Sequence, residues 1–164
     1  MPFDGVVWRH VPAGAHPLHV GFILLARGRW NRFGEYGCLY TSLTREGVVA
    51  EYRKELTQRT GITPDMDQHR DLVSIHVHAE QVLDLSQESE RLRVGVSLEA
   101  LTGDTDDAIE ICHLVADLAR LEGYQAILSP SAALAGAHNL NLYIDGRAAA
   151  VQLMEGADRV PMNY

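Results

Sequence analysis

The most regular alternation of hydrophobic and polar residues in this chain lies at positions 72–78. Apolar and polar side chains alternate there in the order Val73, Ser74, Ile75, His76, Val77 and His78. Because successive side chains of a strand point to opposite faces, this alternation predicts a half-buried strand. Shorter apolar segments predict further strands at 3–10, 38–42, 82–85, 124–128, 139–144 and 148–153. The apolar segment 20–26 fits a buried strand or a short helix, because periodicity alone does not separate the two.

Two segments have the spacing of apolar residues and the end signals that are typical of helices. Thr44 is a good N-cap for a helix that runs to about Thr60, with Gly61 past its end. Its apolar face contains Val48, Val49, Tyr52 and Leu56. A longer helix is capped by Asp104 or Thr105, runs to Leu121 and is ended by Gly123. Its apolar face contains Ile109, Cys112, Val115, Ala116 and Ala119.

Several strands around few helices, without regular alternation, predict an α+β fold with a mixed sheet. At 164 residues the chain is long enough for one compact domain, and we expect that domain to span 1–164. No apolar run approaches the roughly 20 residues of a membrane span, and the N-terminus lacks the pattern of a signal peptide. Cys38 and Cys112 have no metal-type spacing, so reduced thiols in a cytoplasmic protein are favoured over a single disulfide.

The formal net charge of −8 is unevenly distributed along the chain. Residues 1–60 contain eight Arg and Lys against five Asp and Glu, whereas the remainder contains six against seventeen. Thirteen of the fourteen basic residues are arginine, which suits bidentate contact with phosphate oxygens. An acidic protein with a basic first third is a poor general binder of nucleic acid. The distribution instead fits a local anion site for a small phosphorylated ligand.

Four residues in the first third form a set with a shared chemical purpose: Arg9, Arg29, Tyr40 and Glu51. Taken singly, each has a structural interpretation, as a solvated arginine, a core tyrosine or a glutamate facing water. Together, the two arginines could hold a diphosphate, and the tyrosine could hold an aromatic leaving group in a reactive conformation. The glutamate could stabilise the positive charge of an oxocarbenium-like sugar. These are the demands of breaking the nicotinamide–ribose bond of NAD.

The order of these residues resembles the RES domain, a family of bacterial toxins. The matching segments are Trp8-Arg9, 26–31 (Ala-Arg-Gly-Arg-Trp-Asn), Tyr40-Thr41-Ser42, Ala50-Glu51, 82–85, Pro130-Ser131 and His138-Asn139-Leu140. The resemblance therefore spans nearly the whole chain. The first half is the more specific part. The Pro130-Ser131 match in the second half is weaker, because Ser129 also flanks Pro130.

The resemblance implies a fold similar to ADP-ribosyltransferases and an activity on NAD as substrate, with no cofactor. Members of the family transfer ADP-ribose to water, to phosphate or to a protein, and are silenced by an antitoxin that has a DNA-binding domain. By resemblance, Arg9, Arg29, Tyr40, Glu51 and Ser131 are the site residues, with Ser129 as the alternative serine. The resemblance leaves open the acceptor of ADP-ribose and the identity of the antitoxin. It also leaves open the oligomeric state, for which a homo-oligomer is one alternative.

Other functional patterns are weaker. His76 and His78 share a strand face, but no third ligand with suitable spacing accompanies them, so we expect no metal site. The chain has no Rossmann glycine motif and no P-loop. Two rival interpretations come from other classes of protein. One is a non-catalytic module that binds a nucleotide or ADP-ribose, and the other is an interaction protein whose arginine-rich segment docks an acidic partner.

Overall fold

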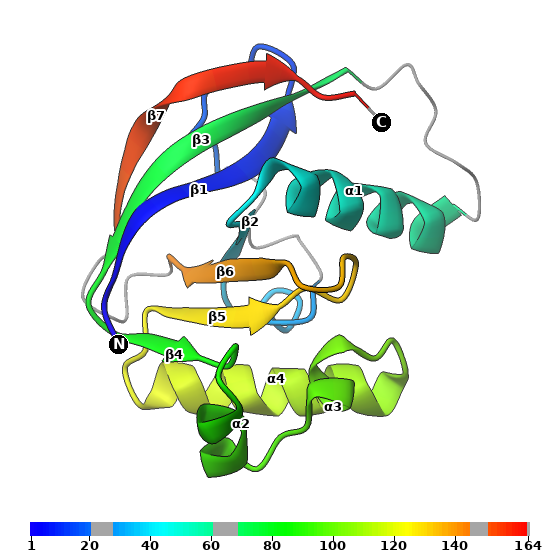
Figure 1. Cartoon of the computed structure of the whole chain (residues 1–164), viewed down its shortest axis with the longest axis vertical. Coiled ribbons are helices and arrows are strands. Elements are labelled where there is room, and N and C mark those ends of the chain that lie inside the picture. The colour runs from blue at the N-terminus through cyan, green and yellow to red at the C-terminus, as the bar shows by residue number, and fades with distance from the viewer. Residues whose placement is uncertain (21–27, 61–68, 145–150, 164) are drawn as a thin grey trace.

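In the part of the chain that the structure describes, seven strands form one mixed sheet in the order β4-β5-β6-β2-β1-β3-β7 (Figure 1). The structure is a computed structural model that describes residues 1–20, 28–60, 69–144 and 151–163. The strands are β1 (Phe3–Pro12), β2 (Cys38–Ser42), β3 (Arg70–Ala79), β4 (Val82–Asp84), β5 (Ala126–Pro130), β6 (His138–Tyr143) and β7 (Gln152–Pro161). Neighbouring strands are antiparallel except β4 and β5, which are parallel. The predicted α+β class and mixed sheet are confirmed.

The predicted strands agree with the observed ones to within a few residues, except for the last strand. It spans Gln152–Pro161 rather than 148–153, and residues 148–150 lie outside the described residues. The apolar segment 20–26 also lies outside them, apart from Val20.

The two halves of the sheet pack against each other. β1, β3 and β7 form a curved half that lies across the half made of β2, β6, β5 and β4 (Figure 1). Between β1 and β2 only one pair, Trp8 and Ser42, is in register, so the sheet turns sharply there. A buried cluster fills the space between the halves, with Val7, Ile75 and Val77 on one side and Leu39, Leu140 and Leu142 on the other.

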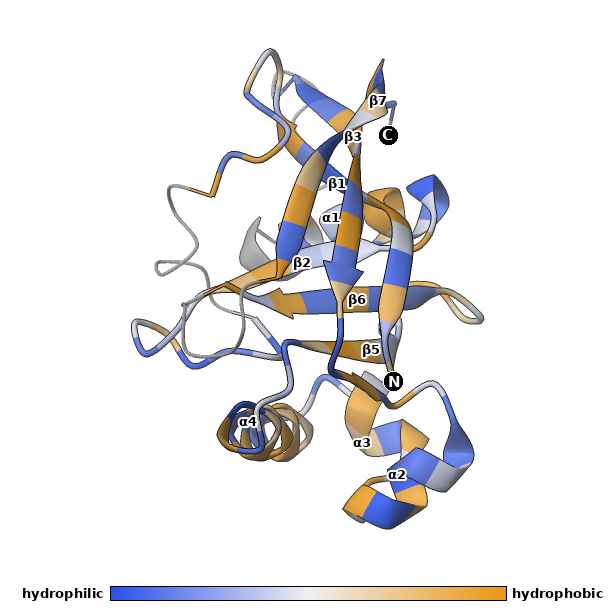
Figure 2. Cartoon of the chain, turned by 90° about the vertical axis from the view of Figure 1, so that its left-hand side faces the viewer, coloured by the Kyte–Doolittle hydropathy of each residue, from blue (hydrophilic) through white to orange (hydrophobic). Residues whose placement is uncertain are grey.

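Polar and apolar residues alternate along the strands of the curved half, which Figure 2 shows as blue and orange bands. One position of the predicted alternation is wrong. Ser74 was expected on the exposed face, but it is 1% exposed. Its hydroxyl accepts a hydrogen bond from the backbone N–H of Asp158 on β7, at 3.0 Å, so the neighbouring strand covers it.

In the described ranges, four helices accompany the sheet: α1 (Arg45–Thr60), α2 (Glu88–Val94), α3 (Leu98–Thr102) and α4 (Asp106–Leu121). Helix α4 lies below the β5 half of the sheet (Figure 1) and packs Cys112, Val115 and Ala116 into a core with Leu83 and Ile127. Thr105, not Asp104, is its N-cap, since the Ala108 N–H bonds the Thr105 hydroxyl at 3.2 Å. Gly123 follows its end with φ 86°, as predicted.

Helices α2 and α3 were not predicted from the sequence. Both are short, and α2 buries none of its residues, so neither has a periodic apolar face that could have indicated it. The two cysteines are free and buried, in agreement with the prediction of reduced thiols. Within the described ranges, no helix is both long and apolar enough to cross a membrane.

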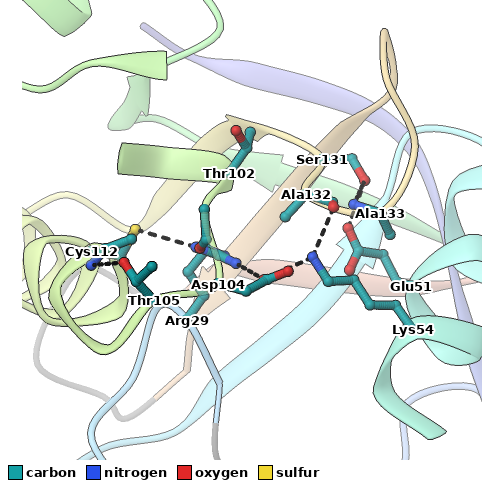
Figure 3. A network of polar contacts seen from close by, with 12 residues as sticks. Arg29, Glu51, Lys54, Thr102, Asp104, Thr105, Cys112, Ser131, Ala132 and Ala133 are labelled. Carbon is teal, nitrogen blue, oxygen red and sulfur yellow. Dashed lines mark hydrogen bonds and ion pairs between the residues drawn. The ribbon is translucent and has the colours of Figure 1, made fainter. Parts of the chain in front are cut away.

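Helix α1 begins where the sequence predicted. The Gly47 N–H bonds the Thr44 hydroxyl at 3.1 Å, so Thr44 is the N-cap. Val48 and Tyr52 pack with Leu72 and Met162, while the predicted C-cap Gly61 lies outside the described residues. This packing fixes the helix against β3 and leaves Glu51 and Lys54 on the side that faces the loop after β5 (Figure 3).

Candidate functional site

A cleft of about 1200 Å³ is lined by β1, the loop at 28–33, β2, α1, the start of α4, and the ends of β5 and β6. Four of the five predicted site residues line it: Arg9, Arg29, Tyr40 and Glu51. They come from four separate segments of the chain, so the fold brings together the residues that the sequence pattern singled out. Ser131 does not line the cleft itself but touches Glu51 from behind.

Glu51 is held by one of its two carboxylate oxygens. Its Oε1 accepts hydrogen bonds from the Ser131 hydroxyl and from the Asn139 side-chain amide, each at 2.6 Å. The Ser131 hydroxyl oxygen in turn accepts the N–H groups of Ala133 and Leu134, both at 3.1 Å. No described residue bonds to Oε2. Glu51 is therefore oriented by Oε1 while Oε2 stays available to a ligand.

Ser131, rather than Ser129, is the serine beside Glu51. Ser129 belongs to the wall of the cleft, but it is fully buried, and its hydroxyl accepts a hydrogen bond from the Asn141 amide at 3.0 Å. Asn139, the second partner of Glu51, was given no role in the sequence analysis. It lies on β6, 88 residues from Glu51. The only sequence signal for it is the segment His138-Asn139-Leu140, which belongs to the family resemblance.

Arg29 lies at one end of the cleft in a network that also contains Asp104 and Lys54 (Figure 3). Its guanidinium donates to the Gly103 carbonyl at 2.6 Å and to Asp104 Oδ1 at 3.0 Å. The Lys54 ammonium pairs with the same Asp104 oxygen at 2.8 Å and donates to the Ala132 carbonyl at 2.8 Å. Burial alone would raise the pKa of Asp104, but the Lys54 hydrogen bond and the two positive charges hold it below its usual value.

Arg9 lies at a second cationic position, beside Arg70. Its guanidinium donates to the Pro17 carbonyl at 3.1 Å, and it pairs with no carboxylate of the described residues. Burial and the charge of Arg70 lower the pKa of Arg9 to about 10. Arg70 itself donates to His10 Nδ1 at 2.6 Å and lies over the ring of Tyr52. Among the described residues, neither Arg9 nor Arg70 has a carboxylate as ion-pair partner, so the two form a site suited to an anion.

His10 is held neutral between these arginines. Burial first, and then the charges of Arg70 and Arg9, lower its pKa to about 3. Because its Nδ1 accepts the Arg70 hydrogen bond, a proton there would break that bond and add a third positive charge.

This arrangement predicts that His10 makes stability depend on pH. The folded-state pKa lies below the unfolded value of 6.5, so the unfolded chain binds the proton first. The contribution of neutral His10 to the free energy of unfolding is fully present above pH 6.5. It is lost as the pH falls from 6.5 toward 3, at a rate approaching about 1.4 kcal/mol per pH unit. Urea unfolding at pH 7.5, 6.5, 5.5 and 4.5 measures this loss, which His10→Asn is expected to flatten. The exposed His16 gives the control variant His16→Asn, and equal slopes in all three proteins would exclude the effect.

Tyr40 links the floor of the cleft to the loop that carries Arg29. Its hydroxyl donates to the Asn31 side-chain oxygen at 2.7 Å and accepts the Trp30 N–H at 2.9 Å. Burial raises its pKa well above the usual value, so the phenol stays protonated. His113 on α4 bonds the Gly28 carbonyl at 3.0 Å. The loop is thereby fixed from two sides, whereas residues 26 and 27 of the motif lie outside the described residues.

Trp30 packs in the core, and the side-chain oxygen of Asn31 accepts the hydrogen bond of the Tyr40 hydroxyl. The proposed contact of Tyr40 with an aromatic leaving group stays a prediction. His76 and His78 each pair with Asp4, at 3.0 Å. Among the described residues, no group of histidine, cysteine, aspartate or glutamate side chains is arranged to hold a metal ion.

Comparisons with known proteins bear on the family and the fold of the chain. The family model described as the RES domain matches residues 6–163. The fold is similar to a chain in the crystal structure of the M. tuberculosis MbcT–MbcA toxin–antitoxin complex, with a TM-score of 0.77 and 20% sequence identity. That similarity covers 98% of this chain and 85% of the other. The comparison with curated proteins gives no match.

Proposed function

The chain belongs to the RES domain family, and from this membership we propose that it is an NAD-cleaving toxin with a cognate antitoxin. The reaction is cleavage of the nicotinamide–ribose bond, with transfer of ADP-ribose to an acceptor. The observation that carries the proposal is Glu51, whose Oε1 is fixed by two hydrogen bonds while its Oε2 has no partner among the described residues.

The chemistry needs an oriented negative charge more than it needs an acid. Nicotinamide leaves as a neutral molecule from a cationic ring, so the leaving group requires no protonation. Positive charge develops on the ribose as the bond opens, and a carboxylate already held in place stabilises it without reorganisation. Oε2 of Glu51 can serve this purpose or accept a hydrogen bond from a ribose hydroxyl.

The cationic groups of the cleft suit the diphosphate of the substrate. Arg9 and Arg70 offer two guanidinium groups at one position, and Arg29 with Lys54 offers a second position. Tyr40 is our candidate for contact with nicotinamide. It lies on β2, lines the cleft and bonds the loop that carries Arg29.

The proposed partner is a protein inhibitor that covers the NAD cleft. The similarity to a chain of a toxin–antitoxin complex supports such a partner, as does the cost to a cell of uncontrolled NAD cleavage. We expect the antitoxin to have a DNA-binding domain and the toxin to act in the cytoplasm, where NAD is found.

Proton NMR of the purified protein with NAD, with and without phosphate, tests the activity directly. We expect free nicotinamide to appear, and the effect of phosphate identifies whether phosphate or water is the acceptor. If neither phosphate nor water accepts ADP-ribose, a cell lysate is added as a source of protein acceptors. Tight binding of NAD without release of nicotinamide under any of these conditions would instead identify a non-catalytic ADP-ribose-binding module.

Ser131 is expected to act on the reaction through Glu51. Ser131→Ala removes one of the two hydrogen bonds to Oε1, so we expect kcat for nicotinamide release to fall about tenfold. The KM for NAD should change little, because Ser131 does not line the cleft. Steady-state kinetics measures both constants, with the exposed Ser89→Ala as control. A raised KM with unchanged kcat would show that Ser131 binds NAD directly, as the family resemblance implied.

A further inference from the structure

Asp104 lies between two cationic side chains of the cleft. Its Oδ1 accepts a hydrogen bond from Arg29 at 3.0 Å and from Lys54 at 2.8 Å (Figure 3). All three residues line the cleft, although they come from the loop at 28–31, from α1 and from the segment before α4. One carboxylate thus neutralises two cations that would otherwise face a ligand.

Each of these cations also has a neutral anchor that does not involve Asp104. Arg29 donates to the Gly103 carbonyl at 2.6 Å, and Lys54 donates to the Ala132 carbonyl at 2.8 Å. Removing the charge of Asp104 would therefore leave both cations held near their present positions. The main contribution of Asp104 to the network is its negative charge.

Asp104 is also the most exposed of the three side chains, and besides the two cations only the Gln58 side chain, among the described residues, is a hydrogen-bond partner of its carboxylate. Its side chain is 49% exposed, against 14% for Arg29 and 21% for Lys54. It follows Gly103 and precedes the N-cap Thr105, so it is not part of a helix. Ion pairs with an exposed partner are weak, and an incoming anion of higher charge can replace such a partner.

From this geometry we propose that Asp104 is an internal counter-anion, which the diphosphate of the substrate displaces to reach Arg29 and Lys54. The inference rests on the proposed function, because it takes the diphosphate to be that of NAD. It adds Lys54 as a phosphate-binding residue and makes Asp104 a determinant of specificity. A diphosphate carries two negative charges and several acceptor oxygens, whereas a singly charged ligand gains little by replacing a carboxylate.

Calorimetric binding of ADP-ribose, which lacks the scissile bond, tests this exchange. Asp104→Asn removes the competing charge but keeps the shape, so we expect it to bind ADP-ribose roughly tenfold more tightly than the unsubstituted protein. Lys54→Met should weaken binding roughly tenfold. Asp106→Asn is the matched control, because it makes the same change of charge at an exposed residue of α4 that does not line the cleft. Adenosine has no phosphate, so its binding should not respond to Asp104→Asn.

Two results overturn the inference. If Asp104→Asn binds ADP-ribose no more tightly than Asp106→Asn does, Asp104 orients Arg29 instead of competing with the ligand. If Lys54→Met binds ADP-ribose as the unsubstituted protein does, Lys54 is not a phosphate ligand. Asp104→Ser provides a second variant with the same expected gain in affinity. Failure of ADP-ribose to bind to any of these proteins, the unsubstituted one included, would instead count against the proposed function.

Discussion

Glu51→Gln is expected to reduce nicotinamide release from NAD on the order of 10²–10³-fold, the usual cost of losing one oriented electrostatic partner. Glutamine has nearly the same shape, and its side-chain oxygen can still accept the hydrogen bonds of Ser131 and Asn139. The substitution therefore removes the negative charge beside the ribose while the surrounding contacts persist. Initial rates from proton NMR at saturating NAD measure the effect on kcat.

The same helix offers a matched control for this prediction. Glu46 lies in the first turn of α1, is exposed and does not line the cleft. Glu46→Gln should leave the rate unchanged within about twofold. A rate for Glu51→Gln within about tenfold of the unsubstituted protein, with equal unfolding midpoints, would contradict the role assigned to Glu51.

Gly28→Ala is expected to disturb both the stability and the site. A Cβ at position 28 would lie inside van der Waals contact of the Tyr40 hydroxyl, and 2.7 Å from the ring carbon Cε2. Either the Tyr40 ring moves and loses its bonds to Trp30 and Asn31, or the loop that carries Arg29 moves. Overpacking of this kind typically costs about 1–3 kcal/mol.

The loss of activity should exceed the loss of stability, because a displacement of about 1 Å in a site can cost on the order of 10² in rate. Urea unfolding gives the change in free energy of unfolding, and NMR of nicotinamide gives the rate of the folded fraction. Gly5→Ala is the control, since its Cβ would make only ordinary contact with the Phe3 ring at 3.5 Å. If Gly28→Ala behaves as Gly5→Ala does in both measurements, the close approach of Gly28 to Tyr40 has no functional consequence.

The structure changes how the arginines of the cleft are grouped. From the sequence, Arg9 and Arg29 are predicted to hold one diphosphate. In the fold, Arg9 has Arg70 as its cationic neighbour, whereas Arg29 shares Asp104 with Lys54. Arg70 and Lys54 belong to no motif of the sequence analysis, because a lone basic residue on a strand or helix has nothing to distinguish it from a solvated charge.

The sequence by itself determined the local elements and the residues that gather in the cleft. The N-cap Thr44 and the β3 strand follow from contacts between near neighbours in the chain, which a short window of sequence contains. Arg9, Arg29, Tyr40 and Glu51 were identified as a set from their residue types and order. Helices α2 and α3 could not be predicted from the sequence, because neither has a periodic apolar face.

Only the tertiary structure decided which side chains meet. Asn139 bonds Glu51 across 88 residues, Ser131 across 80, and Asp104 bonds Arg29 across 75. The family resemblance named Ser131 as a site residue together with Glu51, but no periodicity of the sequence predicts these bonds. They depend on the end of β5 and the start of β6 lying beside α1, and on the segment between α3 and α4 meeting the loop at 28–31. The choice of Ser131 over Ser129 rests on the same cause. Residues 126–129 of β5 are all buried and Asn141 bonds the Ser129 hydroxyl, whereas Ser131, just past the strand, reaches Glu51.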